Sequence, residues 1–218
     1  MILAAGRGER LRPLTDVTPK ALCKVHNIPL IEYHIANLAK AGFNRLVINH
    51  AWLGGQIRQH LGNGARWGIE ICYAPEPPGG LETGGGIVNA LPLLGNQPFL
   101  TVNADIFTDY DFTTLRIPAD SLVHLILVNK PDYFQTGDFG LSSAGIVDNN
   151  IRQYIFSGVA CYRPELFYHT EPGRYSVTPL LRHLAAEGHA SGTIHTGKWM
   201  DMGSPERVAA CGITLTVT

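Results

Sequence analysis

The feature that most constrains this chain is its first segment, where a short apolar run leads directly into a loop rich in glycine and arginine. Residues 2–5 are apolar and are predicted to form a buried strand, and the following loop contains Gly6, Gly8 and three arginines. Glycines let backbone N–H groups point into a concave anion site, and Arg and Lys supply the charge that phosphate oxygens require. A strand followed by such a loop favours an α/β fold that binds a nucleotide.

Two familiar phosphate-binding loops do not fit this segment. A P-loop closes with Gly-Lys-Ser or Gly-Lys-Thr, and neither tripeptide occurs in the sequence. A dinucleotide-binding loop needs a third small residue that packs helix against strand, and an acid about 20 residues further on. Leu11 and Arg12 stand where the third glycine belongs, and residues 24–27 contain no acid. The loop therefore belongs to neither class.

Length, charge and hydropathy limit the kinds of partner. With 218 residues, of which 45% are hydrophobic, the chain is long enough for one sizeable core, and we expect a single domain over residues 1–218. The formal net charge is −1 and there is no basic tract. We expect no nucleic-acid partner, because such binding depends on many Lys and Arg contacts to phosphate. No apolar stretch approaches 18 residues, so no membrane span is expected.

Cysteine usage and the amino terminus bear on the cellular compartment. Four cysteines, Cys23, Cys72, Cys161 and Cys211, are far apart in the chain and form no C-x-x-C pair. We expect them to be reduced packing residues in a cytoplasmic protein. The amino terminus runs directly into a strand, with no charged region or cleavage site before it. No apolar heptad or repeat marks an interface, so the sequence predicts no oligomeric state.

Apolar runs alternate with segments of helical periodicity, which is typical of a mostly parallel sheet covered by helices on both faces. Strands are predicted over residues 2–5, 46–49, 69–73, 99–102, 123–128, 155–162 and 193–195. Helices are predicted over residues 30–41, 53–61, 177–186 and 205–210, and another begins at the glycine cluster 83–86. Exposed N–H groups at the start of that helix are candidates for reading a base.

Asp105 closely follows the apolar strand predicted over residues 99–102. It should lie at the carboxyl end of a central strand, where open α/β sheets bind their ligands. Mg2+ keeps several waters and needs only one or two protein carboxylates beside phosphate oxygens. Taken alone, an aspartate at the end of a strand is more often a turn or helix-capping residue; with the first loop present, Asp105 is a candidate metal ligand.

The loop over residues 3–15 reads L-A-A-G-R-G-E-R-L-R-P-L-T and is followed by Pro19 and Lys20. This long motif resembles the signature of the sugar-1-phosphate nucleotidyltransferases. The resemblance implies a single Rossmann-like, three-layer domain of the nucleotide-diphospho-sugar transferase fold, without the left-handed β-helix domain that many members carry. It also implies Mg2+-dependent transfer of a nucleotide to a sugar 1-phosphate, with release of pyrophosphate.

The same resemblance implies roles for individual residues. Lys20 and Arg10 would neutralise phosphate charge and, with Asp105, form the catalytic set, while Asp105 and Asp201 would hold Mg2+. The nucleotide-binding residues that it implies are Leu3, Ala4, Ala5, Gly6, Gly8, Lys20, Glu82, Gly85 and Asn103. The sugar phosphate is expected at Asp138, Ser157 and Gly158.

Plainer interpretations stand beside these roles. Lys20 and Arg10 fit ordinary surface charges, and Arg7 and Arg12 are expected to be solvated. The glycine cluster after Thr83 fits a flexible turn with Thr83 as a helix cap. Ser157 fits a buried serine whose hydroxyl bonds to backbone.

Sequence segments further along the chain make the resemblance more specific, among them L-E-T-G-G-G-I at residues 81–87 and A-L-P-L-L-G at 90–95. They are similar to uridylyltransferases that act on N-acetylmuramate 1-phosphate in cell-wall sugar recycling, which implies UTP as the nucleotide. Guanylyl transfer to mannose or heptose 1-phosphate is an alternative. A non-catalytic nucleotide-sugar-binding module is another, and it predicts a broken loop or a missing metal acid. Neither defect is present.

Overall fold

The computed structural model describes residues 1–210 and 214–216. Its central sheet has seven strands, in the spatial order β12 (Ala190–His195), β8 (Val123–Asn129), β11 (Tyr154–Tyr162), β6 (Phe99–Asn103), β1 (Ile2–Leu3), β4 (Arg45–His50) and β5 (Glu70–Pro75). Every predicted strand is present, and the largest shift is in β12, which begins at Ala190. The parallel pairs are β1 with β4, β1 with β6, β4 with β5, and β8 with β12. β11 runs antiparallel to β6 and β8, so the sheet is mostly parallel, as predicted.

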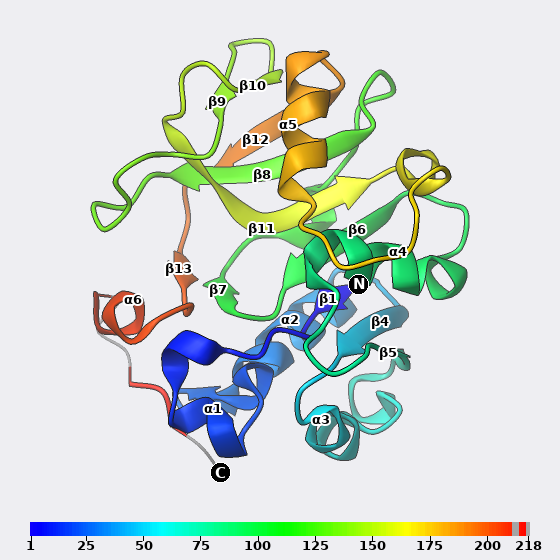
Figure 1. Cartoon of the computed structure of the whole chain (residues 1–218), viewed down its shortest axis with the longest axis vertical. Helices are drawn as coiled ribbons and strands as arrows, with labels where there is room; N and C mark the ends of the chain where they lie inside the picture. The colour runs from blue at the N-terminus through cyan, green and yellow to red at the C-terminus, as the bar shows by residue number, and fades with distance from the viewer. Residues whose placement is uncertain (211–213, 217–218) are drawn as a thin grey trace.

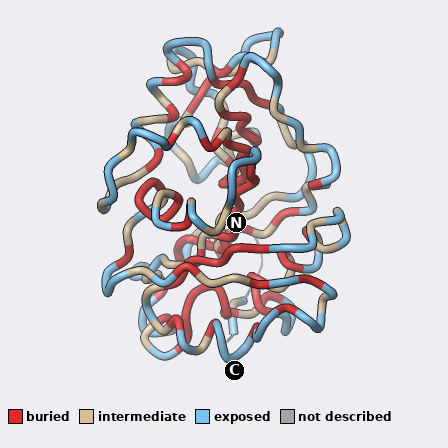
Figure 2. The backbone as a smooth tube through the Cα atoms, turned by 90° about the vertical axis from the view of Figure 1, so that its right-hand side faces the viewer, coloured by how far each residue is buried: buried red, intermediate tan, exposed pale blue. Residues whose placement is uncertain are grey.

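Helices cover both faces of this sheet (Figure 1). On one face are α2 (Leu30–Lys40) and α3 (Gly54–Leu61), and on the other are α4 (Glu82–Leu94) and α5 (Thr178–Ala186). Strand side chains alternate between the two apolar layers: Leu46 and Ile48 pack with α2 and α3, whereas Val47 packs with α4. This period of two is the geometry of a pleated strand. Figure 2 shows buried residues concentrated in the interior of the molecule and exposed residues in its outer loops. The three-layer α/β fold is confirmed.

Two-stranded ribbons that the sequence did not predict lie outside the central sheet. They pair β7 (Ile106–Thr108) with β13 (Trp199–Asp201), β2 (Lys24–Val25) with β3 (Ile28–Pro29), and β9 (Gly140–Leu141) with β10 (Val147–Asp148). Strands of two or three residues are too short to show a hydrophobic period. The β7–β13 ribbon has the greatest consequence, because it brings the carboxyl-terminal part of the chain to the end of β6.

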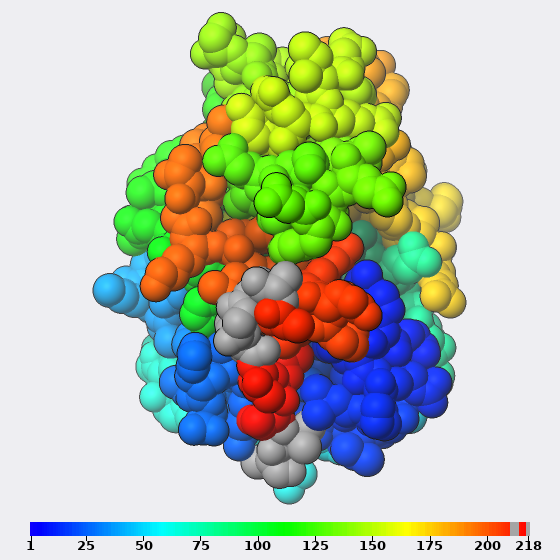
Figure 3. Space-filling model, turned by 90° about the vertical axis from the view of Figure 1, so that its left-hand side faces the viewer, coloured from blue at the N-terminus to red at the C-terminus, as the bar shows by residue number. Residues whose placement is uncertain are grey.

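The described residues near the carboxyl terminus, 205–210 and 214–216, contact earlier parts of the chain. In Figure 3, α6 (Pro205–Ala210) lies beside the amino-terminal segments, which include α1 (Leu14–Val17). The guanidinium of Arg207 lies 4.5 Å from the ring centroid of Phe134, and Lys24 forms a β-bridge with Thr216.

Cys23, Cys72 and Cys161 are unpaired thiols, and Cys211 lies outside the described residues. Burial raises the pKa of Cys23 and Cys161 to about 11. These two cysteines therefore act as packing residues rather than reactive thiols. None of the helices in the described part of the chain has the length and apolar character needed to cross a membrane.

Candidate active site

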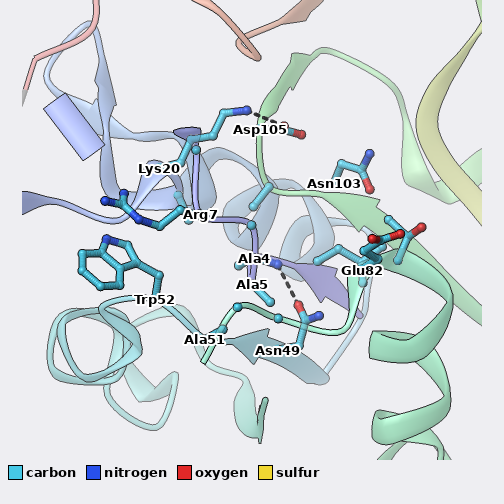
Figure 4. Close-up of a pocket in the computed structure, with 18 of the residues that line it drawn as sticks. Ala4, Ala5, Arg7, Lys20, Asn49, Ala51, Trp52, Glu82, Asn103 and Asp105 are labelled. Atoms are coloured by element: carbon cyan, nitrogen blue, oxygen red, sulfur yellow. Dashed lines mark hydrogen bonds and ion pairs between the residues drawn. The ribbon is translucent and has the colours of Figure 1, made fainter. Parts of the chain in front are cut away.

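A cavity of about 580 Å³ opens at the carboxyl ends of β1, β4 and β6 (Figure 4). It is lined by residues 3–9, 20–21, 49, 51–52, 79–80, 82–83, 103–105 and 174. These include eight of the nine predicted nucleotide-binding residues, together with Asp105. Gly85 is not among them. The cavity is at the edge of the sheet where the sequence predicts ligand binding.

The two loop glycines are needed for different reasons. Gly8 has a left-handed φ of +71°, and its carbonyl oxygen accepts a hydrogen bond of 2.8 Å from the hydroxyl of Thr15. A Cβ atom at Gly8 would lie 2.9 Å from Cγ2 of Thr15. A Cβ atom at Gly6 would meet nothing within 4 Å. Gly8 thus shapes the loop, whereas Gly6 leaves open space in the cavity for a ligand.

Lys20 and Asp105 meet at the centre of the site. Nζ of Lys20 donates to Oδ2 of Asp105 over 2.5 Å; the lysine side chain is 9% exposed and the aspartate 38%. Burial opposes ionisation of Asp105, but the charge and hydrogen bond of Lys20, helped by Arg10, hold the pKa of this carboxyl below its usual value. A cation and an ionised carboxylate therefore face the cavity together.

Asp201 lies next to Asp105 because of the β7–β13 ribbon. In the register of that ribbon, Asp201 is opposite Ile106, and the backbone N–H of Met202 donates to the carbonyl oxygen of Asp105 over 2.9 Å. The ribbon thus brings the backbone of Asp201 next to that of Asp105, although Asp201, unlike Asp105, does not line the cavity.

The carboxylate of Asp201 is engaged within the chain. Oδ1 accepts a 2.6 Å hydrogen bond from the N–H of Gly203, and Oδ2 forms an ion pair with Arg207. Arg10 is exposed and does not line the cavity; its Nη2 would lie 2.9 Å from a Cβ atom at Gly203. No group of three or more His, Cys, Asp or Glu side chains suited to a metal occurs in the described residues, so any metal here must rely on few protein ligands.

A partly buried chain of hydrogen bonds that the sequence analysis missed, the Asn49–Glu76 relay, joins the first loop to the loop after β5. Oδ1 of Asn49 accepts from the N–H of Ala4 over 2.7 Å (Figure 4). Nδ2 of Asn49 donates to Glu76 over 2.6 Å. The other carboxylate oxygen of Glu76 accepts from the N–H of Leu81 over 2.7 Å. Burial raises the pKa of Glu76, and these hydrogen bonds oppose the shift. The only signal in the sequence was an Asn near the end of an apolar strand.

Glu82 begins α4 in a strained conformation. Its φ of +60° is left-handed, which is costly for a residue with a side chain and is often found at ligand sites. Its carboxylate pairs with Nε of Arg174 at 3.4 Å, and Arg174 also lines the cavity. Oγ1 of Thr83 accepts from the N–H of Val177 over 3.0 Å rather than capping its own helix. Arg174 is a further site residue that sequence reasoning missed, because it lies in an irregular segment before α5.

The start of α4 is covered by the chain itself. The N–H groups of Gly84 and Gly85 both donate to the carbonyl of Tyr175, at 3.0 and 3.2 Å, and the N–H of Tyr175 donates to Leu81. A Cβ atom at Gly85 would overlap the carbonyl oxygen of Gly173. The expectation that these N–H groups are exposed to a base is therefore wrong for Gly84 and Gly85. The structure places Gly85 as a packing residue beside the cavity.

The residues predicted for the sugar phosphate lie on or beside β11. Oδ2 of Asp138 accepts from the N–H of Phe156 over 2.9 Å. Ser157 is 1% exposed, and its hydroxyl accepts from the N–H two residues further on, as the plainer interpretation has it. Gly158 has a φ of +84°, and a Cβ atom there would lie 2.8 Å from Nδ2 of Asn103. Gly158 therefore contacts Asn103, which lines the cavity. The side chains of Asp138 and Ser157 accept hydrogen bonds from backbone N–H groups instead.

Comparisons with known proteins show the family to which the chain belongs. Residues 1–211 match the model of the nucleotidyl transferase family. The chain is 50% identical over 217 residues to an N-acetylmuramate alpha-1-phosphate uridylyltransferase of Neisseria meningitidis serogroup B, covering 94% of this chain and 92% of the relative. It is 33% identical to an enzyme of the same name from Caulobacter vibrioides, with the same coverage. The structure of HddC from Yersinia pseudotuberculosis complexed with GMP-PN superposes with a TM-score of 0.78 at 19% identity, covering 96% of this chain and 95% of that one.

Proposed function

The chain belongs to the nucleotidyl transferase family, as a sugar-1-phosphate nucleotidyltransferase, and we propose that it transfers UMP from UTP to N-acetylmuramate 1-phosphate. The products are the UDP-sugar and pyrophosphate. The observation that carries this proposal is the meeting of the first loop, Lys20 and Asp105 in one cavity at the carboxyl ends of β1 and β6. The two uridylyltransferase relatives support the choice of UTP and of the sugar.

The triphosphate would lie along the first loop. Backbone N–H groups of residues 5–8 would hold the β and γ phosphates, in the manner of a concave anion site. Lys20 would contact the α phosphate beside Asp105. Arg10, which does not line the cavity, would approach the leaving pyrophosphate from outside the cavity. The base would lie at the other end of the cavity, near Glu82 and Asn103, which Figure 4 shows on the side away from Lys20.

The residues present fit a magnesium ion. Asp105 is ionised, partly exposed and just beyond the end of a central strand, and Mg2+ needs only one or two carboxylates when phosphate oxygens complete its shell. Asp105 would be the first ligand. Asp201 would be the second, once its ion pair with Arg207 opens. When bound, the ion neutralises charge on the phosphate oxygens.

The reaction needs no protein nucleophile. An oxygen of the sugar 1-phosphate forms a bond to the α phosphorus of UTP, and the bond from that phosphorus to the β-phosphate oxygen breaks, so that pyrophosphate leaves with the electron pair. The attacking group is already an anion, and no base has to remove a proton from it. The work of Lys20 and the loop is therefore positioning and stabilisation of charge. The sugar phosphate would enter beside Asn103 and Gly158, with Asp138 and Ser157 supporting that wall.

The test is a grid of pyrophosphate-release assays with Mg2+. UTP, GTP, CTP, ATP and dTTP are each paired with the 1-phosphates of N-acetylmuramate, N-acetylglucosamine, glucose, mannose and heptose. Release confined to UTP with N-acetylmuramate 1-phosphate is the expected result. Release with GTP and mannose or heptose 1-phosphate would support nucleotidyl transfer but contradict the assignment of UTP and N-acetylmuramate 1-phosphate as substrates. Nucleotide binding without release in any pair would favour a non-catalytic module.

A further inference from the structure

Arg7 lines the cavity, and several contacts hold its side chain in place. Its Nη1 donates to the carbonyl oxygen of Thr15 over 2.6 Å, and its Nη2 pairs with Asp16 at 2.7 Å. The guanidinium lies 4.0 Å from the ring centroid of Trp52, whose Nε1 also donates to the carbonyl of Thr15 over 3.0 Å. Figure 4 shows Arg7 and Trp52 together on the side of the cavity away from Glu82. The expectation that Arg7 is simply solvated is wrong, since its side chain is only 21% exposed.

We propose that Arg7 binds the terminal phosphates of the nucleotide, and the pyrophosphate formed from them, and that Trp52 positions it for this contact. The inference rests on the proposed function, because it needs a nucleoside triphosphate in the cavity. With the base at Glu82 and the α phosphate at Lys20, the β and γ phosphates continue along residues 5–8. Arg7 belongs to that stretch and lines the same cavity.

The charge balance of the cavity supports a phosphate-binding role for Arg7. The cation of Lys20 is matched by Asp105, and that of Arg174 by Glu82, both of which line the cavity. Arg7 is matched by Asp16, which does not line it. Of the lining cations, Arg7 is the one whose partner acid lies outside the cavity.

Asp16 does not consume the binding capacity of Arg7. The same carboxylate oxygen of Asp16 also accepts from Nε of Arg12 over 2.8 Å. A guanidinium has five N–H donors in a planar fork suited to phosphate, and the contacts to Thr15 and Asp16 use two of them. Since these contacts and the ring of Trp52 already fix the side chain, little rotamer entropy remains to be lost on binding.

The experiment compares Arg7→Ala with Arg12→Ala. Both variants remove an arginine that pairs with Asp16, but Arg12 is 54% exposed and outside the cavity. Direct calorimetric binding of pyrophosphate with Mg2+ is measured first, and then the KM for UTP and for the sugar 1-phosphate. For Arg7→Ala we expect pyrophosphate affinity to fall roughly ten- to a hundredfold, the loss of a charged hydrogen bond. The KM for UTP should rise in parallel and that for the sugar phosphate should stay the same, while Arg12→Ala binds like wild type.

Two conservative variants separate binding from folding. Arg7→Lys keeps the charge but loses the fork, so it should recover part of the affinity. Trp52→Phe keeps an aromatic face under Arg7 and should bind pyrophosphate more tightly than Trp52→Leu. Wild-type pyrophosphate affinity in folded Arg7→Ala, or equal losses in Arg7→Ala and Arg12→Ala, would overturn the inference and leave the proposed function standing. Wild-type protein that neither binds pyrophosphate nor releases it would instead overturn the proposed function.

Discussion

The contact between Lys20 and Asp105 is the interaction on which the proposed chemistry most depends. Lys20 is almost fully buried, and its ammonium is directed at the one carboxylate in the centre of the cavity. Removing one preorganised charge from such a site typically costs about 100- to 1,000-fold in rate. We expect Lys20→Ala and Asp105→Asn each to lower kcat by at least that factor, measured as pyrophosphate release.

A matched control for these variants is Asp120→Asn, which changes an exposed aspartate in a loop remote from the cavity lining. It should retain wild-type turnover. Circular dichroism would establish that all three variants are folded. Near-normal turnover in Lys20→Ala or Asp105→Asn would remove that residue from the mechanism.

His34 makes the stability of the fold sensitive to acid. It lies buried on α2, with Nε2 2.9 Å from the carbonyl oxygen of Ile106, and burial lowers its pKa from 6.5 to about 4. Below pH 6.5 this histidine is protonated in the unfolded chain but stays neutral in the folded chain. The contribution of His34 to stability is therefore fully present above pH 6.5 and is lost as the pH falls toward 4. His34 alone would account for a loss of up to about 3 kcal/mol.

Urea unfolding at pH 7 and at pH 5 measures this effect. In His34→Gln, whose amide N–H can still reach the carbonyl of Ile106, the difference in unfolding free energy between the two pH values should shrink. A residual slope is expected from His50 and His124, whose pKa values burial also lowers. His183→Gln, on the exposed side of α5, should behave as wild type. An unchanged slope in His34→Gln would contradict the argument.

Helix α4 owes its position to a close approach between backbones. The N–H groups of Gly84 and Gly85 are satisfied by Tyr175, and the carbonyl of Gly173 leaves no room for a side chain at Gly85. Gly85→Ala should therefore push residues 173–175 away and displace Arg174 from the cavity. We expect a loss of roughly 1–3 kcal/mol of stability, as for other overpacked sites, and a higher KM for UTP.

Gly55→Ala is the matched control for this substitution. Gly55 also lies in a helix, α3, but a Cβ atom there would meet nothing within 4 Å. An alanine in a helix is favoured over glycine by roughly 0.5–1 kcal/mol, so this variant should be slightly more stable than wild type. Thermal unfolding and KM for UTP would be compared for the two variants. If Gly85→Ala matched Gly55→Ala in both, the packing argument would fail.

The cavity as a whole joins distant parts of the chain, from the first loop to Arg174. A ligand that binds there binds only the folded protein, so it should raise the unfolding temperature. UTP with Mg2+ at a hundred times its Kd would add about 2.7 kcal/mol, or about 5–10 °C for a domain of this size. Differential scanning fluorimetry would show this shift. Its absence at millimolar UTP would contradict nucleotide binding in this cavity.

The order of strands and helices in the central sheet, and much of the cavity lining, could be predicted from the sequence because the signals are local. Residues 46–48 face alternate layers of the sheet, as their apolar run implies, and the first loop carries its own motif of glycines and charges. Asp105 could be placed at the edge of the sheet because it closely follows an apolar strand. Each of these inferences depends only on neighbouring residues and on the geometry of a strand.

The remaining features depend on contacts between segments that lie far apart in the sequence. Three such features arise when distant segments pack together. They are the β7–β13 ribbon, which brings the backbone of Asp201 beside that of Asp105, the Asn49–Glu76 relay, and the ion pair of Arg174 with Glu82. Arg7 and Arg12 look alike in the sequence, yet packing directs one into the cavity and leaves the other in solvent. Periodicity and motifs report the neighbours of a residue along the chain, whereas these roles are set by neighbours in space.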